Sequence, residues 1–218
     1  MRPAKVRSNH PDNQYFYGIR HSFSIRLLTL QRMTIVPLET DIKGLILIHS
    51  RIFTDDRGWF SEGYRRSAFH ELGIQDDFSQ DNLSWSRRNV IRGLHFQRVP
   101  HAQAKLVRVL QGEVLDVAVD LRPQSSTYLR VFTCRLSAAE GLMLYVPTGF
   151  AHGFRALEDS LFSYKCSSEY RPESDGGVRW DDPTLCVDWG MKPGEPAFLS
   201  DKDRALPSVQ EWIGRQST

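Results

Sequence analysis

A stretch near the middle of the chain, VIRGLHFQRVPHAQAKLV, combines residues that can move protons with residues typical of a buried strand. His95 stands here between Arg92 and Lys105. An imidazole exchanges protons near neutral pH, and a fixed cation stabilises negative charge that develops on a substrate oxygen. The three residues therefore predict proton transfer beside an anionic group. The alternative for His95 is a hydrogen-bonded core histidine, and the neighbouring cations argue against it.

A second histidine, His152, ends the segment PTGFAH, which resembles the PxGxxH half-motif of the cupin β-barrels. In that pattern Pro and Gly turn the chain before a strand that points its histidine into the barrel. A metal-binding cupin would also need an HxH pair and a downstream Glu, but this chain has His95-Phe96-Gln97. Two imidazoles without a third ligand make a poor metal site. We therefore expect no metal, and a metal-dependent cupin oxygenase or isomerase is the weaker alternative.

Short apolar runs with Gly and Pro between them must position these residues. In residues 113–122 Leu115 and Val117 alternate with Val114 and Asp116, which predicts a strand with two distinct faces. Gln111-Gly112 predicts a hairpin turn before it. The many short strands indicate a mainly β fold, a cupin or double-stranded β-helix (jelly-roll) barrel.

Few helices are expected. Residues 67–73 have Ser67 as a helix N-cap and Gly73 as a stop, and a helix near the end is expected to have Pro207 at its first position.

Composition limits the class of protein. The 218 residues are 40% hydrophobic and 25% charged, as in a soluble globular protein, and no aliphatic run could span a bilayer. The three cysteines are scattered, which fits a reducing cytoplasm better than a disulfide framework.

The net charge of +2 is unevenly distributed. Residues 1–33 are basic and the remainder is slightly acidic, so we expect no nucleic-acid-binding surface on the body. The sequence predicts a basic N-terminal extension over residues 1–33 and a single cupin-like domain over residues 34–218. The extension has three interpretations: a disordered arm, an upstream start that is not used, or an Arg-rich transit peptide. We favour the first two.

Several segments together resemble the dTDP-4-dehydrorhamnose 3,5-epimerase family. They run in family order from about residue 35 to residue 207, and they are DDRGWFSE, QDNLSWS, VIRGLHFQ, AQAKLV, GEVLDVAVDLR, VPTGFAHGF, SYKCSSEYRPESDGGVRWDDP and LSDKD.

The resemblance implies inversion of both carbons beside the ketone of dTDP-4-dehydro-6-deoxy-D-glucose, giving dTDP-4-dehydro-L-rhamnose. Each inversion needs a base on one face, an acid on the other and a positive group for the enolate oxygen. By resemblance, His95 is the base, Asp203 its carboxylate partner, Lys105 the cation and Tyr164 the proton donor. Asp201 competes with Asp203 for its role. No cofactor is required, because the substrate's ketone is the electron sink.

The resemblance also implies the binding residues. Arg92 and Arg57 match diphosphate contacts, and His152 is expected to line the pocket. Gln80, Asn82 and Tyr170 match nucleotide contacts. Phe60 and Glu62 match residues that family members lend to the neighbouring subunit of a homodimer.

Two departures leave the stereochemistry open. Asp175 stands where the family usually has Glu, and one residue is missing between His152 and Tyr164. A single-carbon epimerase of a related nucleotide-linked 4-ketosugar is therefore one alternative, and a non-catalytic sugar-nucleotide-binding cupin is another. We expect a cytoplasmic enzyme that binds neither nucleic acid nor membranes.

Overall fold

The computed structural model describes residues 34–216, and the predicted extension over residues 1–33 lies outside the described residues. Strands dominate the described part, with a few short helices between and after them. In chain order the elements are β1 (Ile35–Glu39), β2 (Ile46–Ser50), β3 (Ile52–Asp55), β4 (Gly58–Ser61), α2 (Arg66–Glu71), β5 (Gln80–Ser86), β6 (Ile91–Gln97), β7 (Lys105–Gln111), β8 (Glu113–Asp120), β9 (Val131–Ser137), β10 (Leu142–Val146), β11 (Phe150–Ala156), β12 (Ser160–Cys166), the 3-10 turn η1 (Pro172–Ser174), β13 (Asp175–Gly177), α3 (Asp201–Arg204) and α4 (Val209–Gln216).

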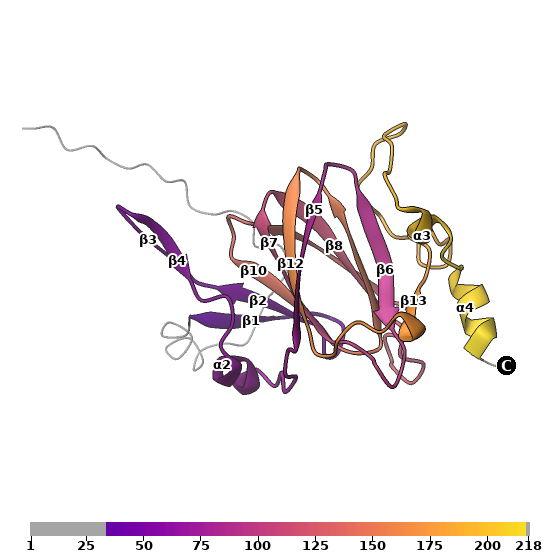
Figure 1. Cartoon of the computed structure of the whole chain (residues 1–218), viewed down its shortest axis with the longest axis horizontal. Coiled ribbons are helices and arrows are strands. Elements are labelled where there is room, and N and C mark those ends of the chain that lie inside the picture. Colours follow the sequence, from indigo (N-terminus) through magenta and orange to yellow (C-terminus); the bar gives the residue numbers. More distant parts are fainter. Residues whose placement is uncertain (1–33, 217–218) are drawn as a thin grey trace, which may run out of the picture. The chain divides into compact units, whose positions relative to one another are not determined.

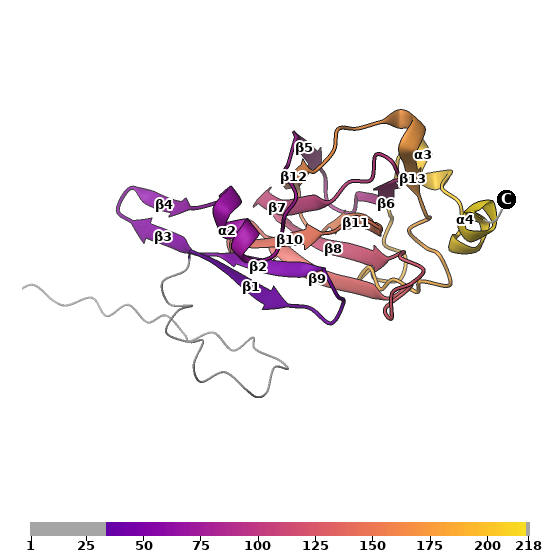
Figure 2. The same cartoon turned by 90° about the horizontal axis from the view of Figure 1, so that it is seen from below.

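Two antiparallel sheets face each other. The first has the order β1-β2-β10-β7-β12-β5, and the second has the order β13-β6-β11-β8-β9 (Figures 1 and 2). A separate hairpin, β3–β4, extends away from these sheets; we call it the arm. The predicted mainly β jelly roll is confirmed.

The prediction of a hairpin turn at Gln111-Gly112 was wrong. Strand β7 pairs with β10 and β12 in the first sheet, whereas β8 pairs with β9 and β11 in the second. The two residues therefore carry the chain from one sheet to the other. A tight crossover and a hairpin use the same turn residues, so local sequence could not separate them. Gly112 is required here because its φ is +75° and a Cβ would lie 2.4 Å from the carbonyl oxygen of Asp159.

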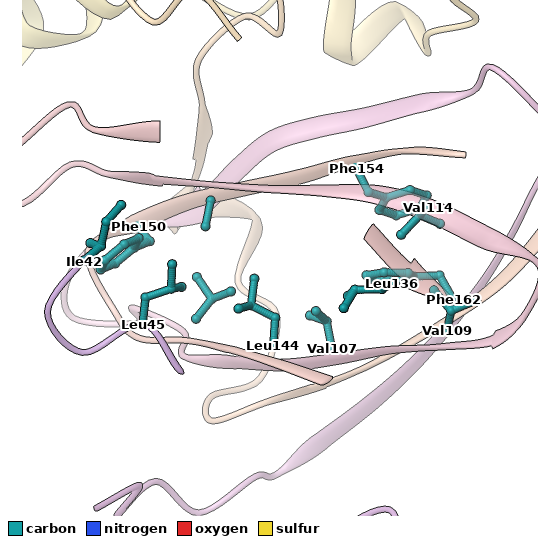
Figure 3. Packing of buried hydrophobic residues seen from close by; sticks show 12 residues of the cluster. Ile42, Leu45, Val107, Val109, Val114, Leu136, Leu144, Phe150, Phe154 and Phe162 are labelled. Carbon is teal, nitrogen blue, oxygen red and sulfur yellow. The ribbon is translucent and has the colours of Figure 1, made fainter. Parts of the chain in front are cut away.

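The main core fills the space between the inner faces of the two sheets, as Figure 3 shows. Val107 and Phe162 project from the first sheet, and Val114 and Phe154 project from the second. The alternation predicted for β8 is confirmed, since Val114 and Ala118 lie in this core while Val117 and Val119 pack on the outer side of the same sheet.

Each outer face has its own cover. Helix α2 and the loop after it pack Phe69 and Ile74 onto the first sheet. The C-terminal residues, including Trp189 and Val209, cover the second sheet. A buried ion pair fastens this cover, because Nη2 of Arg155 lies 2.9 Å from Oε2 of Glu195.

Both predicted helices exist, but their starts differ from the predictions. Helix α2 has Arg65 as its N-cap in place of Ser67, and Gly73 follows its end with a φ of +86°. Helix α4 starts after Pro207, and Ser208 and Glu211 form a capping box: the Glu211 amide donates to Ser208 Oγ, and the Ser208 amide donates to Glu211 Oε2. Within residues 34–216, no helix is long and apolar enough to cross a bilayer.

Candidate active site

A cavity of about 260 Å³ opens between the two sheets, at the end where β6, β11 and β12 approach helix α3. Its walls are polar and charged on several sides and aromatic at Phe154 and Phe162. It is lined by Ser84, Arg92, His95, Lys105, His152, Gly153, Phe154, Phe162, Tyr164, Ser200, Lys202 and Asp203. All four residues expected to be catalytic thus lie around one space.

His95 and Asp203 form a close pair in this wall. Nε2 of His95 lies 2.5 Å from Oδ1 of Asp203, and Ser200 Oγ donates to the other carboxylate oxygen at 2.8 Å. Ser200 is also the N-cap of α3, where its Oγ accepts the Asp203 amide. Asp203 is 4% exposed, whereas Asp201 points to the surface, so the structure brings Asp203 to the imidazole and leaves Asp201 outside.

Burial alone would raise the pKa of Asp203. The hydrogen bond and charge of His95, the hydrogen bond from Ser200 and the charge of Lys202 outweigh burial, and the net pKa is lowered. The carboxylate therefore stays ionised at neutral pH. With Nε2 of His95 engaged by this carboxylate, Nδ1 is the nitrogen available to take a proton.

A β-bulge brings Arg92 and His95 to the same face of β6. Residues three apart on a regular strand point to opposite faces. Here His95 pairs with His152 and Arg92 pairs with Phe154, so β6 has one residue more than β11 between the two pairs. Ile91 and Leu94 consequently both pack outward, while Arg92 and His95 both line the cavity.

Two glycines permit the close approach of the β6 and β11 backbones at this bulge. Gly93 has a φ of +132°, and a Cβ on it would lie 2.6 Å from Cα of Gly153. Gly153 in turn packs against the carbonyl of Arg92. No other residue type combines this backbone angle with so near a neighbouring backbone.

Tyr164 and Lys105 come from the opposing sheet, on β12 and β7. Burial, reinforced by the Cys166 thiol and opposed by Arg92 and Lys202, raises the pKa of Tyr164, so its phenol is protonated at neutral pH. Burial lowers the pKa of Lys105, and the acidic groups of Cys166, Asp116 and Asp175 act in the opposite direction. The lysine and the protonated phenol thus belong to one sheet, and the imidazole to the other.

His152 lies in the same wall as His95, directly across from it on β11. Its Nε2 contacts both carboxylate oxygens of Asp116, at 3.0 and 3.1 Å, and both residues are buried. Sequence reasoning missed Asp116. A carboxylate on the same strand face as Val114 and Ala118 was the signal that could have identified it, since a buried charge requires a partner.

A second cavity of about 310 Å³ adjoins the first and shares His95, Lys105, Tyr164 and Lys202 with it. Three residues expected to contact the nucleotide lie here: Gln80, Asn82 and Tyr170. Gln80 Oε1 accepts the backbone N–H of Tyr170 at 2.8 Å, and Gln80 Nε2 donates to Asn82 Oδ1. The strand β5 and the loop that carries Tyr170 are thereby joined at this cavity.

Lys202 is a further cation that sequence reasoning missed, although it stands beside Asp203 in the LSDKD segment. It forms an ion pair with Asp175 and lies 6.0 Å from the ring centroid of Tyr170. Because it borders both cavities, it can meet a ligand that spans them.

The Arg92 side chain is fixed in place by hydrogen bonds to two residues of strand β5. Its Nε donates to Ser86 Oγ at 2.9 Å, and its Nη2 donates to the carbonyl of Trp85 at 3.0 Å. The guanidinium keeps further N–H groups for a ligand.

Three expected binding residues do not line either cavity. Arg57 and Phe60 belong to the arm, where Arg57 pairs with Asp55 at the turn and Phe60 is 67% exposed. Glu62 lies at the base of the arm, where its carboxylate accepts from Thr34 Oγ1 at 2.7 Å and from Arg65. Within one chain these residues are therefore separate from the His95 cavity.

Gln97 replaces the second histidine of the metal-cupin pattern. Its amide donates to the carbonyls of His101 and Glu169, and its oxygen accepts the Arg171 N–H. It thus holds the loop around Tyr170. Among residues 34–216 no group of three or more His, Cys, Asp or Glu side chains could hold a metal ion.

Comparisons with known proteins agree on one family. Residues 39–211 match the family model described as dTDP-4-dehydrorhamnose 3,5-epimerase. A curated protein of that name from Escherichia coli K12 is 46% identical over 178 residues, covering 81% of this chain and 95% of the relative.

Two solved structures are also similar. The crystal structure of dTDP-6-deoxy-D-glucose-3,5-epimerase RmlC from Legionella pneumophila, in complex with dTDP-4-keto-L-rhamnose, has a TM-score of 0.77 and 42% identity, covering 81% of this chain and 93% of that chain. The crystal structure of ChmJ, a 3'-monoepimerase from Streptomyces bikiniensis in complex with dTDP-quinovose, has a TM-score of 0.70 and 29% identity, covering 82% of this chain and 96% of that chain.

Proposed function

The chain belongs to the dTDP-4-dehydrorhamnose 3,5-epimerase family, and we propose that it inverts C3 and C5 of dTDP-4-dehydro-6-deoxy-D-glucose to give dTDP-4-dehydro-L-rhamnose. The predicted enzyme class, an isomerase, is confirmed by this membership. One observation carries the assignment of residues. The His95 imidazole and the Tyr164 phenol come from opposite sheets and line the same cavity, which Asp203, paired with His95, and Lys105 also line.

The base removes a proton from a carbon next to the ketone. Nδ1 of His95 takes the proton, the C–H electron pair forms the enolate double bond, and the carbonyl electrons move to O4. Asp203 holds the ring and stabilises the imidazolium that results. Lys105 faces the negative charge on O4, where a fixed cation in a partly dry site contributes roughly 3 kcal/mol.

The acid returns a proton to the opposite face. Tyr164 donates its phenolic proton to the carbanionic carbon, the enolate collapses to the ketone, and the configuration at that carbon is inverted. The raised pKa of Tyr164 suits this role, because the phenol must enter each cycle protonated. The phenolate then regains a proton from solvent while the imidazolium loses one, which resets the site for the second carbon.

The nucleotide occupies the adjoining cavity in this proposal. Gln80 and Asn82 contact the thymidine portion and Tyr170 stacks on the base. Lys202, which borders both cavities, contacts the diphosphate, and Arg92 reaches the diphosphate from within the sugar cavity. His152 lines the sugar end, with Asp116 fixing its ring.

The arm supports a homodimer. Its Phe60 and Trp59 are 67% and 64% exposed, and the outer face of β5 exposes Leu83 and Trp85. Such apolar exposure is typical of a surface that another chain covers. We propose that the arm carries Arg57 and Phe60 into the neighbouring subunit's site, and that Glu62 joins them there.

A mixing experiment tests this arrangement. Phe60→Ala and His95→Ala are each expected to be poorly active, since one lacks the arm contact and the other lacks the base. If the arm crosses between subunits, a mixed dimer has one site with both intact residues and recovers up to about half of the wild-type activity per such dimer. If each arm served its own subunit, no mixture would recover activity.

The three free cysteines support a cytoplasmic location. Inversion of both carbons is preferred to inversion of one, because the similarity to the 3,5-epimerase relatives, at 42–46% identity, exceeds the 29% identity to the monoepimerase.

The deciding experiment is NMR of dTDP-4-dehydro-6-deoxyglucose in D2O with the enzyme. With the wild-type enzyme we expect deuterium at both C3 and C5 and formation of dTDP-4-dehydro-L-rhamnose. With His95→Ala we expect no exchange at either carbon, although its affinity for dTDP should be nearly the same as that of the wild type. Exchange at one carbon only would replace the proposal by a monoepimerase. Absence of exchange above buffer would leave a non-catalytic binder.

A further inference from the structure

Ser84 is a polar residue of the sugar cavity whose hydrogen-bonding capacity is not used. It lines the cavity, but its Oγ is buried and has no partner among the described residues. A buried hydroxyl without a hydrogen-bond partner destabilises the folded state, because the contact with water that it loses is not replaced. Serine has three staggered rotamers, so rotation about χ1 can redirect Oγ at little cost. A ligand hydroxyl in the cavity would remove the penalty.

The position of Ser84 along β5 shows which part of a sugar nucleotide it would meet. Gln80, Asn82 and Ser84 alternate on one face of the strand, and the first two border the nucleotide cavity. Each step of two residues advances about 6.6–6.8 Å. Ser84 is therefore one step further from the nucleotide, beside the sugar ring.

The order of residues along β5 narrows the choice among the sugar hydroxyls. Asn82 borders the nucleotide cavity, and Ser84 is the next residue on that strand face and the first of them to line the sugar cavity. Because the diphosphate joins the nucleoside to C1 of the sugar, C1 is the end of the sugar nearest to the nucleotide cavity. The hydroxyl nearest to C1 is the one on C2. This hydroxyl also keeps its configuration throughout the reaction, whereas the one on C3 changes sides.

We propose that Ser84 binds the 2-hydroxyl of the sugar and makes the enzyme selective for 2-hydroxylated over 2-deoxy 4-ketosugars. The proposal rests on the proposed function. Ser84 and Tyr164 lie diagonally across the β5–β12 pairing, with Ser84 opposite Phe162 and Asn82 opposite Tyr164. A fixed 2-hydroxyl would hold C3 in one position relative to the phenol while the ring changes shape.

The test combines Ser84→Ala with removal of the 2-hydroxyl from the substrate. For dTDP-4-dehydro-6-deoxyglucose we expect Ser84→Ala to lower kcat/KM about tenfold, with the Kd of dTDP unchanged. For the 2-deoxy analogue, wild type and Ser84→Ala should be equal within twofold, because the contact is already absent. Ser163→Ala, which removes a hydroxyl from the outer side of the neighbouring strand, is the matched control and should behave as wild type with both substrates.

Two outcomes would overturn the proposal. Equal kcat/KM for Ser84→Ala and wild type with the natural substrate would show that the hydroxyl is not used. An equal loss with both substrates would show that Ser84 supports the structure and does not read C2. Wild-type exchange in D2O is measured in the same series, so that failure of the epimerase function itself is recognised separately.

Discussion

His95 and Asp203 stand 108 positions apart in the chain, yet Nε2 of the imidazole lies 2.5 Å from Oδ1 of the carboxylate. The carboxylate arrives on a helix of only four residues, α3, whose N-cap Ser200 holds its second oxygen. The base is thus oriented by a short element that the barrel itself does not contain.

Replacing this carboxylate should reduce catalysis without removing the pocket. We expect Asp203→Asn to lower kcat by about 100-fold or more, because the amide neither fixes the tautomer of His95 nor stabilises its charged form. Binding of dTDP should change little. Asp201→Asn is the control, since Asp201 is exposed on the same helix. A loss of kcat in Asp201→Asn with none in Asp203→Asn would assign the role to Asp201.

Removing the phenol should uncouple proton removal from inversion. In Tyr164→Phe the His95 base is intact, so we expect deuterium exchange at C3 or C5 to continue at a reduced rate. Complete conversion to the inverted product should fall below detection, because the donor on the far face is missing. NMR of the substrate in D2O measures both quantities. Full inversion at the wild-type rate would remove Tyr164 from the mechanism.

The bulge at Gly93 should tolerate no side chain. Gly93→Ala introduces a Cβ 2.6 Å from the backbone of Gly153, in addition to the strain of a φ of +132°. Gly58 has nearly the same φ, +131°, with no atom within 4 Å of its ideal Cβ. We expect Gly58→Ala to lower the free energy of unfolding by about 1–2 kcal/mol, and Gly93→Ala to lower it considerably more. Urea unfolding measures the free energy of unfolding of both variants. Equal decreases would contradict the conclusion that the close approach of β6 and β11 requires Gly93.

Asp120 should make the free energy of unfolding fall at acidic pH. Burial alone would raise its pKa, but hydrogen bonds from Arg122, Ser125 and Thr127 lower it from 3.8 to about 2. A carboxyl whose pKa is lower in the folded state stabilises the protein above its unfolded pKa, and this stabilisation is lost as the pH falls toward the folded pKa.

We therefore expect the difference in unfolding free energy between wild type and Asp120→Asn to be constant above about pH 5. It should narrow by roughly 2 kcal/mol between pH 4 and pH 2. Urea unfolding at several pH values measures it. A difference that stayed constant down to pH 2 would show that the carboxylate is not stabilised in this way.

Local segments were enough to carry the resemblance that assigns the catalytic roles, because chemistry constrains residue type. His95, Lys105, Tyr164 and Asp203 were each predicted from a local segment, and the structure brings all four around one cavity. The alternation along β8 likewise depends only on the two-residue period of a strand, and it was confirmed.

Features that depend on distant partners were not predicted. The spacing of Arg92 and His95 implied opposite faces, and only the pairing of β6 with β11 reveals the bulge that reconciles them. The crossover at Gly112 and the partnership of Asp116 with His152 have the same origin. Neither is written in neighbouring residues, because each depends on which strand lies alongside.

The location of the imidazole and the phenol on different sheets has a consequence for how this reaction is tuned. Among residues 34–216 each hydrogen-bonded ladder stays within one sheet, so the gap across which protons are delivered is set by the thickness of the aliphatic and aromatic side chains between the sheets. Residues such as Leu136 and Leu144 belong to this packing between the sheets and do not line the His95 cavity, so we expect them to affect the reaction only through the spacing of the sheets. A lineage adapting to a bulkier or slimmer ketosugar could adjust that gap by exchanging methyl groups in the interior, leaving every proton-transferring side chain unchanged.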